Sequence, residues 1–171
     1  MIASKVRDIL IPLADYPHLT RSATVHDAFD LLCRSDLAAG WRYRHVLVFD
    51  EEQTLLGVAG LHDLLRALMP EYLKTSVMEH YSGVAGEESS LSLIWQESFE
   101  AQCQQVGQTS VAACATPVTT TVKSDDPVAR AAYLMAAHNL NMLPVLEGPQ
   151  VVGVVRIVDV FNLAAEAMNH V

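Results

Sequence analysis

The stretch VVGVVRIVDVF, residues 151–161, carries the pattern that decides the fold. Its apolar, β-branched first half predicts a buried strand, and a helix is expected to start directly afterwards. An acid, Asp159, stands where that helix would begin. The stretch LLGVAGLHDLL, residues 55–65, has the same shape, with Asp63 as its acid. A chain that ends two buried strands in the same way contains an internal repeat.

The repeat extends far upstream of these two stretches. Three further pairs of segments match in the same order: VRDILIP (6–12) with VAACATP (111–117), TVHDAFDLL (24–32) with PVARAAYLM (127–135), and HVLVFD (45–50) with MLPVLE (142–147). The first copy carries six extra residues, around AAGWRYR, between its first helix and the next strand. Ordered matches of this kind predict two copies of one structural unit.

Each copy is predicted to form a short strand, a helix, two strands and a closing helix. Thr24 is a candidate helix N-cap with Asp27 in the capping-box position, and Pro127 suits a first helical turn. The closing helices are expected to end at Pro70 and near Met168.

A polar region and then a helix are expected between the copies. That helix carries an apolar stripe at helical spacing, with Trp95 and Phe99 on it. The predicted fold is therefore α/β, with two β-α-β-β-α repeats packed with pseudo-two-fold symmetry. Its segments are residues 1–69 for repeat one, 70–110 for the helical insertion and 111–171 for repeat two, together one compact module.

Composition excludes several classes of function. The net charge of −9 and the pI near 5.1 argue against nucleic acid or an anionic membrane as the main partner. The three cysteines show no CxxC spacing, and the N-terminus is too polar for a signal peptide, so a cytoplasmic location is expected. The seven histidines show no HxxxH or HExxH spacing, which argues against a metal site, and no motif of a catalytic nucleophile is present. Cys33 and Cys114 are expected to be core residues.

The V-x-D-I-L-x-P opening, the T-V-x-x-A helix start, the L-P-V strand and the repeated G-h-h-x-x-x-D close (h, hydrophobic) resemble cystathionine-β-synthase (CBS) domains. Two tandem copies in that family pack as one regulatory unit, a Bateman module. The resemblance implies a module without catalysis that binds an adenosine-containing ligand in the cleft between the repeats: AMP, ADP, ATP or S-adenosylmethionine. With no partner domain attached, it would be a stand-alone module acting on an unknown protein target. The alternative is a structural module with an empty cleft that joins a dimer or docks a partner.

By the same resemblance, Asp63 and Asp159 would accept hydrogen bonds from ribose hydroxyls. Without a ligand, an acid in the first turn of a helix is also stabilised by the helix dipole, by about 0.3–1 kcal/mol. Nucleotide-binding repeats commonly carry Ser or Thr three residues before this acid, but here those positions are Gly60 and Arg156. Arg156 could bind a phosphate through its planar fork, or pair with an acid at a dimer contact.

The residues near the short first strand and just before the second strand would line the slot for adenine. In repeat two they are Thr120, Leu140, Asn141 and Met142, and in repeat one Pro17, Tyr43, Arg44 and His45. At any single one of these positions, ordinary packing at the edge of the core is the favoured explanation. The basic and aromatic stretch GWRYRH, residues 40–45, could hold an anionic ligand or form a lid, and its alternation equally suits a strand with one solvent-exposed face.

A homodimer is also expected, because three apolar stripes are hard to bury in one chain of this size. The contact is predicted to use the two closing helices, with the Trp95 helix as a brace. The apolar residues that carry this prediction are Leu61, Leu64, Leu65 and Leu68, and Ile157, Val160, Phe161, Ala164, Ala165 and Met168. The alternative is that the Trp95 helix folds back over its own monomer.

Overall fold

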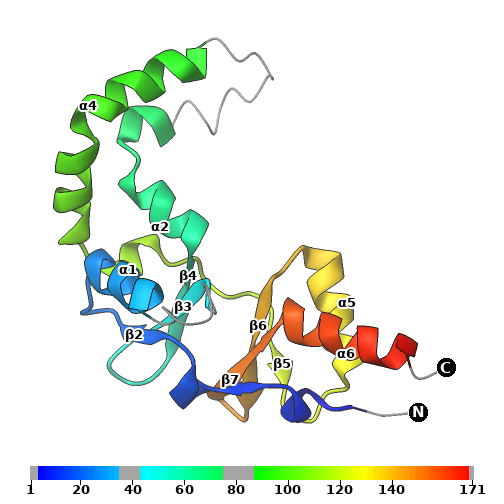
Figure 1. Ribbon diagram of the computed structural model, residues 1–171. Coiled ribbons are helices and arrows are strands. Elements are labelled where there is room, and N and C mark those ends of the chain that lie inside the picture. Colours follow the sequence, from blue (N-terminus) through cyan, green and yellow to red (C-terminus); the bar gives the residue numbers. More distant parts are fainter. Residues whose placement is uncertain (1–3, 35–42, 75–86, 170–171) are drawn as a thin grey trace. The chain divides into compact units, whose positions relative to one another are not determined.

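The computed structural model describes residues 4–34, 43–74 and 87–169, and the chain forms two compact units (Figure 1). The terminal unit consists of Met1–His18, Glu52–Leu55 and Val118–Val171. The central unit consists of Leu19–Glu51 and Leu56–Pro117. The units therefore do not follow the segments 1–69, 70–110 and 111–171, because the N-terminal segment packs with repeat two and residues 111–117 pack with repeat one.

The terminal unit contains a four-stranded sheet in the order β1-β7-β6-β5. Its strands are β1 (Ile11–Pro12), β7 (Gln150–Arg156), β6 (Met142–Glu147) and β5 (Val122–Lys123). Strand β7 pairs antiparallel with both neighbours, whereas β5 and β6 run parallel. Gly148, in the tight turn between β6 and β7, has a φ of 58°, which glycine adopts at little cost.

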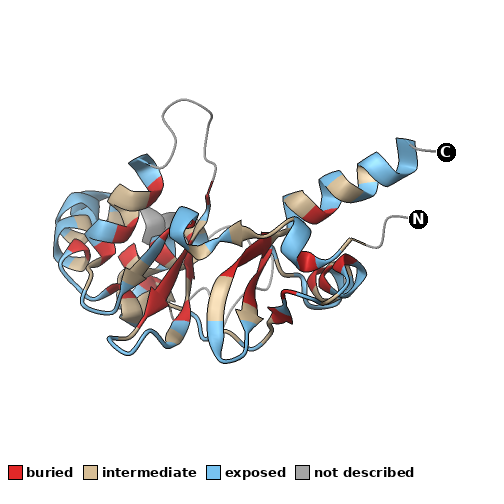
Figure 2. Cartoon of the chain, turned by 90° about the horizontal axis from the view of Figure 1, so that it is seen from below, coloured by how far each residue is buried: buried red, intermediate tan, exposed pale blue. Residues whose placement is uncertain are grey.

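Two helices complete the terminal unit, α5 (Val128–His138) and α6 (Ile157–Asn169). Helix α5 ends at Asn139, which takes the left-handed conformation typical of a helix C-cap. The two helices and the sheet enclose one apolar core, made by Val6, Val122, Val128, Ala131, Met135, Leu143, Val145, Val155 and Val160. In Figure 2 the buried residues of this unit gather on its strands, while the helix that leads to the C-terminus is mostly exposed.

The central unit is built on a three-stranded sheet in the order β2-β3-β4. Its strands are β2 (His18–Thr20), β3 (His45–Phe49) and β4 (Leu55–Gly60), and its helices are α1 (Val25–Arg34), α2 (Leu61–Leu68) and α4 (Glu87–Gly107). Helix α4 contacts both α1 and α2, and the short helix η3 (Val111–Cys114) also packs on both (Figure 1). Val25, Ala28, Leu32, Val46, Leu47, Val48, Ala59, Leu64 and Val111 are buried in this unit.

The predicted order of elements is confirmed: strand, helix, strand, strand and helix occur twice along the chain. The N-cap prediction at Thr24 is also confirmed, because Asp27 accepts from the Thr24 backbone N–H at 2.8 Å and donates its own N–H to the Thr24 hydroxyl at 3.1 Å. Helix α2 ends at Leu68, two residues before Pro70, as expected. Of the stretch GWRYRH, residues 40–42 lie outside the described residues.

Equivalent glycines receive the opening segment of the other repeat. Thr116 bridges Val58 in the central unit, and Ile11 pairs with Val154 in the terminal unit. A Cβ on Gly57 would lie 2.6 Å from the Thr116 carbonyl oxygen, and one on Gly153 would meet the Ile11 carbonyl oxygen. The glycines of the repeated pattern are therefore needed because backbone from another part of the chain passes directly over them.

Candidate functional site

Each repeat places its acid at a strand-to-helix corner that is closed by the same backbone hydrogen bond. The first N–H of α2, on Leu61, donates to the carbonyl oxygen of Arg44 at 3.1 Å. The first N–H of α6, on Ile157, donates to the carbonyl oxygen of Asn141 at 2.9 Å. The residue just before β3 or β6 is thereby held beside the start of the closing helix. We call these places the repeat-one corner (residues 44–45 and 60–63) and the repeat-two corner (residues 141–142 and 156–159).

An imidazole, a glycine and a carboxylate make up the repeat-one corner. The Asp63 carboxylate accepts the backbone N–H of Gly60 at 2.8 Å, which caps the start of α2. A Cβ on Gly60 would lie 2.8 Å from Cδ2 of His45 and 3.5 Å from Oδ2 of Asp63. The absence of a side chain at residue 60 therefore leaves room for the imidazole. Burial lowers the pKa of His45, and the nearby Asp63 carboxylate opposes that shift.

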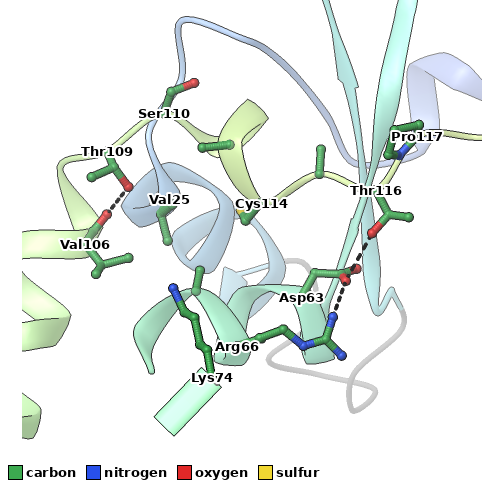
Figure 3. Close-up of a pocket in the computed structure, with 13 residues that line it drawn as sticks. Val25, Asp63, Arg66, Lys74, Val106, Thr109, Ser110, Cys114, Thr116 and Pro117 are labelled. Carbon is green, nitrogen blue, oxygen red and sulfur yellow. Dashed lines mark hydrogen bonds and ion pairs between the residues drawn. The ribbon is translucent and has the colours of Figure 1, made fainter. Parts of the chain in front are cut away.

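The Asp63 carboxylate also lines an open pocket of about 540 Å³ within the central unit (Figure 3). Helices α1 and α2, η3 and the C-terminal end of α4 form its walls. Thr116 donates its hydroxyl to Oδ1 of Asp63 at 3.3 Å, and Nη1 of Arg66 lies 3.8 Å from the same oxygen. Lys74 lines the pocket from the helical turn after Pro70. The volume lies in the range of small-molecule sites, about 300–1,000 Å³.

The pocket carries charges of both signs, a carboxylate from Asp63 and cations from Arg66 and Lys74. The Asp63 side chain is 23% exposed and that of Arg66 is 61% exposed, so their long ion pair contributes little to stability and the guanidinium remains accessible. Lys74 lies 3.5 Å from Glu71, again as a partly exposed pair. One carboxylate and two cations on one wall can hold a ligand that carries both hydroxyl donors and an anionic group.

The thiol of Cys114 lines the same pocket but is not prepared as a nucleophile. Burial raises its pKa, and it donates to the Val111 carbonyl oxygen at 3.1 Å. A protonated thiol is a weak nucleophile. The expectation that Cys33 is a core residue was wrong, because it is exposed. Leu32 takes the buried position of α1, and the next residue is turned by about 100° around the helix.

A bidentate ion pair occupies the repeat-two corner. Nε of Arg156 donates to Oδ2 of Asp159 and Nη2 donates to Oδ1, both at 2.8 Å. The two side chains are 22% and 20% exposed. Arg156, the last residue of β7, therefore pairs with the acid three residues later in the first turn of α6. From the sequence, Arg156 was expected either to bind a phosphate or to pair with an acid at a dimer contact. The pair with Asp159 was not among these expectations.

The other predicted residues are placed unevenly around the two corners. His45 lies against the Asp63 corner, whereas the Arg44 side chain is exposed and only its carbonyl is used there. In repeat two, Met142 is buried in β6 and pairs in register with Arg156. The remaining predicted residues of repeat two are Leu140, half-buried against the core, Thr120, half-buried before β5, and Asn141, exposed. In repeat one, Pro17 and Tyr43 are buried.

Arg66, Lys74 and Thr116 were not predicted from the sequence. A signal for Arg66 was present, because a residue three positions after Asp63 on a helix shares its face. Thr116 could not be found in this way, since its neighbour Asp63 lies far away in the sequence and the contact depends on how the repeats exchange their opening segments.

In residues 4–34, 43–74 and 87–169, no group of three or more His, Cys, Asp and Glu side chains is placed to hold a metal ion. Within these same ranges, no helix is both long and apolar enough to cross a membrane.

Comparisons with known proteins agree with the repeated architecture. Among solved structures, CBSX2 from Arabidopsis thaliana is 18% identical and superposes with a TM-score of 0.68, covering 99% of both chains. A structure of CBSX2 in complex with AMP is 21% identical, with a TM-score of 0.63 and coverage of 96% of this chain and 98% of that one. The CBS domain of a membrane protein from Sphaerobacter thermophilus is 20% identical, with a TM-score of 0.65 and coverage of 93% and 86%.

No curated protein matches the chain. The family model described as CBS domain matches residues 6–70 and again residues 111–166. These two matched ranges are the two repeats, and together they make up more than half of the chain. The protein belongs to the CBS domain family and carries two copies of the domain in tandem.

Proposed function

We propose that this protein is a regulatory module that senses an adenosine-containing nucleotide, and that Asp63 holds the ribose. The observation that supports this proposal is the pocket that Asp63, Arg66 and Lys74 line together. Ribose offers two neighbouring hydroxyl donors that one carboxylate can accept. Hydrogen bonds to a charged group contribute roughly 1.5–3 kcal/mol each.

The cations of the pocket suit the phosphate end of a nucleotide. Arg66 carries a planar fork that matches a phosphate group, and Lys74 adds a flexible point charge. Helix α2 begins at Leu61, and the positive end of its dipole favours an anion. The ligands we propose are AMP, ADP, ATP or S-adenosylmethionine, and the AMP complex of CBSX2, a protein of similar fold, supports this class.

A second candidate function is that of a structural module that dimerises or docks a protein target. The observation that favours it is the exposed apolar face of α6, where Phe161 is 71% exposed and Met168 is 75% exposed. An apolar face of this kind is typical of an interface between copies or with another protein. The two functions are compatible, since a sensing module needs a target to act on.

A thermal-shift screen of the full chain separates the two. A ligand present at one hundred times its Kd, and bound only by the native state, stabilises by about 2.7 kcal/mol. We expect at least one of AMP, ADP, ATP and S-adenosylmethionine to raise the melting temperature in a concentration-dependent manner, with guanosine as the matched control. No shift with any of the four at millimolar concentration would remove the sensing function and leave the structural one.

A further inference from the structure

The two corners differ at the residue three positions before the acid, and this residue changes what the carboxylate is paired with. The residue before the closing helix is Gly60 in repeat one and Arg156 in repeat two. Arg156 donates from Nε and Nη2 to both carboxylate oxygens of Asp159, and both side chains are about one-fifth exposed. Both oxygens of the Asp159 carboxylate thus accept hydrogen bonds from one mostly buried guanidinium.

Asp63 has no such partner at the equivalent position. Its Oδ2 accepts the Gly60 backbone N–H, while its Oδ1 receives, from the described part of the chain, a longer bond of 3.3 Å from Thr116. Among the described residues, Arg66 forms an ion pair with Asp63 at 3.8 Å from an exposed side chain. An incoming hydroxyl can therefore reach Oδ1 without displacing a short charged hydrogen bond.

We propose that Arg156 closes the repeat-two carboxylate to ribose, so that each chain binds one nucleotide and binds it at Asp63. This inference rests on the proposed function. Ribose hydroxyls are neutral donors, so replacing the guanidinium fork by two hydroxyls gives up the attraction between two opposite charges. It would also leave a mostly buried guanidinium without its carboxylate, which is costly. Repeat one carries Gly60 at the same place, so ribose binding at Asp63 breaks no such ion pair and leaves no buried guanidinium without its carboxylate.

Calorimetric titration of the full chain with AMP tests this inference, because titration gives stoichiometry and affinity separately. We expect one AMP per chain for the wild type. Arg156→Ser removes the guanidinium and restores a residue of the type common in nucleotide-binding repeats, so it should give two AMP per chain. Asp159→Ala in the Arg156→Ser background should return the number to one. Arg130→Ser is the matched control, since Arg130 forms an exposed pair with Asp126 in the same unit, and its stoichiometry should stay at one.

Each other outcome is decisive. Two AMP per chain in the wild type, or one per chain in a folded Arg156→Ser variant, would overturn the closing role of Arg156 while leaving the proposed function intact. No binding by either protein, with AMP or with ATP, would overturn the proposed function and with it the single-site assignment. Circular dichroism of each variant shows whether the fold is retained.

Discussion

A Cβ on Gly57 would lie 2.6 Å from the carbonyl oxygen of Thr116 and 2.9 Å from the carbonyl carbon of the same residue. Both are backbone atoms, and Thr116 forms a bridge with Val58, so they cannot turn aside as a flexible side chain would. The contact joins the second strand of repeat one to the segment that opens repeat two. It explains why the repeated pattern begins with glycine.

The first prediction follows from this contact. Gly57→Ala should lower the free energy of unfolding by about 1–3 kcal/mol, the usual cost of forcing an extra group into a packed site. Urea unfolding followed by circular dichroism measures it. Gly107→Ala is the control, because the nearest atom to a Cβ there, Cβ of His26, lies 3.7 Å away. Equal stability of Gly57→Ala and the wild type would contradict the described packing.

The second prediction concerns pH. Burial lowers the pKa of His45 in the folded chain. In the unfolded chain the imidazole binds a proton near pH 6.5, whereas the folded chain binds this proton only at a lower pH. More protons on the unfolded state mean that stability falls as the pH drops below about 6.5. The charged groups acting on His45 are Asp63, which opposes the shift, and Arg44 and His62, which add to it.

His45→Gln should therefore flatten the loss of stability between about pH 6.5 and pH 5, because it removes the titrating group. Chemical unfolding at half-unit pH steps measures the slope. His138→Gln, which alters an exposed side chain at the end of α5, serves as the control and should keep the wild-type slope. An unchanged slope in His45→Gln would sink this assignment.

The third prediction concerns the pocket cations. Arg66→Gln should weaken ATP binding about tenfold, the effect of losing roughly one charged hydrogen bond, and Lys74→Gln should act in the same direction. Adenosine, which has no phosphate, should bind both variants like the wild type. Arg34→Gln is the control because that arginine forms an exposed pair with Asp30 on α1. Equal losses for ATP and adenosine would place the phosphate elsewhere.

The fourth prediction is a homodimer. Phe161 is 71% exposed on α6 while Val160 beside it is buried, so one face of the helix builds the core and another is left for a partner. Sedimentation equilibrium at micromolar concentration should give twice 18.7 kDa for the wild type and 18.7 kDa for Phe161→Glu. Asn162→Glu adds the same charge to the next residue of α6 and should remain dimeric. A wild-type mass of 18.7 kDa would exclude the dimer.

The sequence predicted the order of elements because the repeat itself carries the signal. Matching VRDILIP to VAACATP placed Ile11 on Thr116, and the structure sets these residues over Gly153 and Gly57 respectively. The matching could not show that each opening segment packs with the other repeat's sheet. The two repeats have equivalent sheets. An opening segment therefore buries a similar surface on the sheet of its own repeat and on that of the other repeat, and both arrangements leave the same pattern in the sequence.

The sequence predicted less of the candidate site than of the fold. Asp63 and Asp159 look equivalent in the sequence, but their surroundings depend on residues 60 and 156. A separation of three residues across the start of a helix allows Arg156 and Asp159 to meet, although only the three-dimensional structure shows both carboxylate oxygens engaged. The apolar stripe of α6 was likewise visible, but not which of its residues face the core.

The most direct test of the central claim, that Asp63 holds the ribose of an adenosine nucleotide, is calorimetric titration of the Asp63→Asn variant with AMP or ATP. This variant keeps an oxygen to accept the Gly60 N–H but loses the charge, so the cap of α2 should survive. We predict binding at least about tenfold weaker than in the wild type, from the loss of a charged hydrogen bond. Asp30→Asn on α1 is the matched control and should bind like the wild type. Wild-type affinity in a folded Asp63→Asn variant would contradict the account.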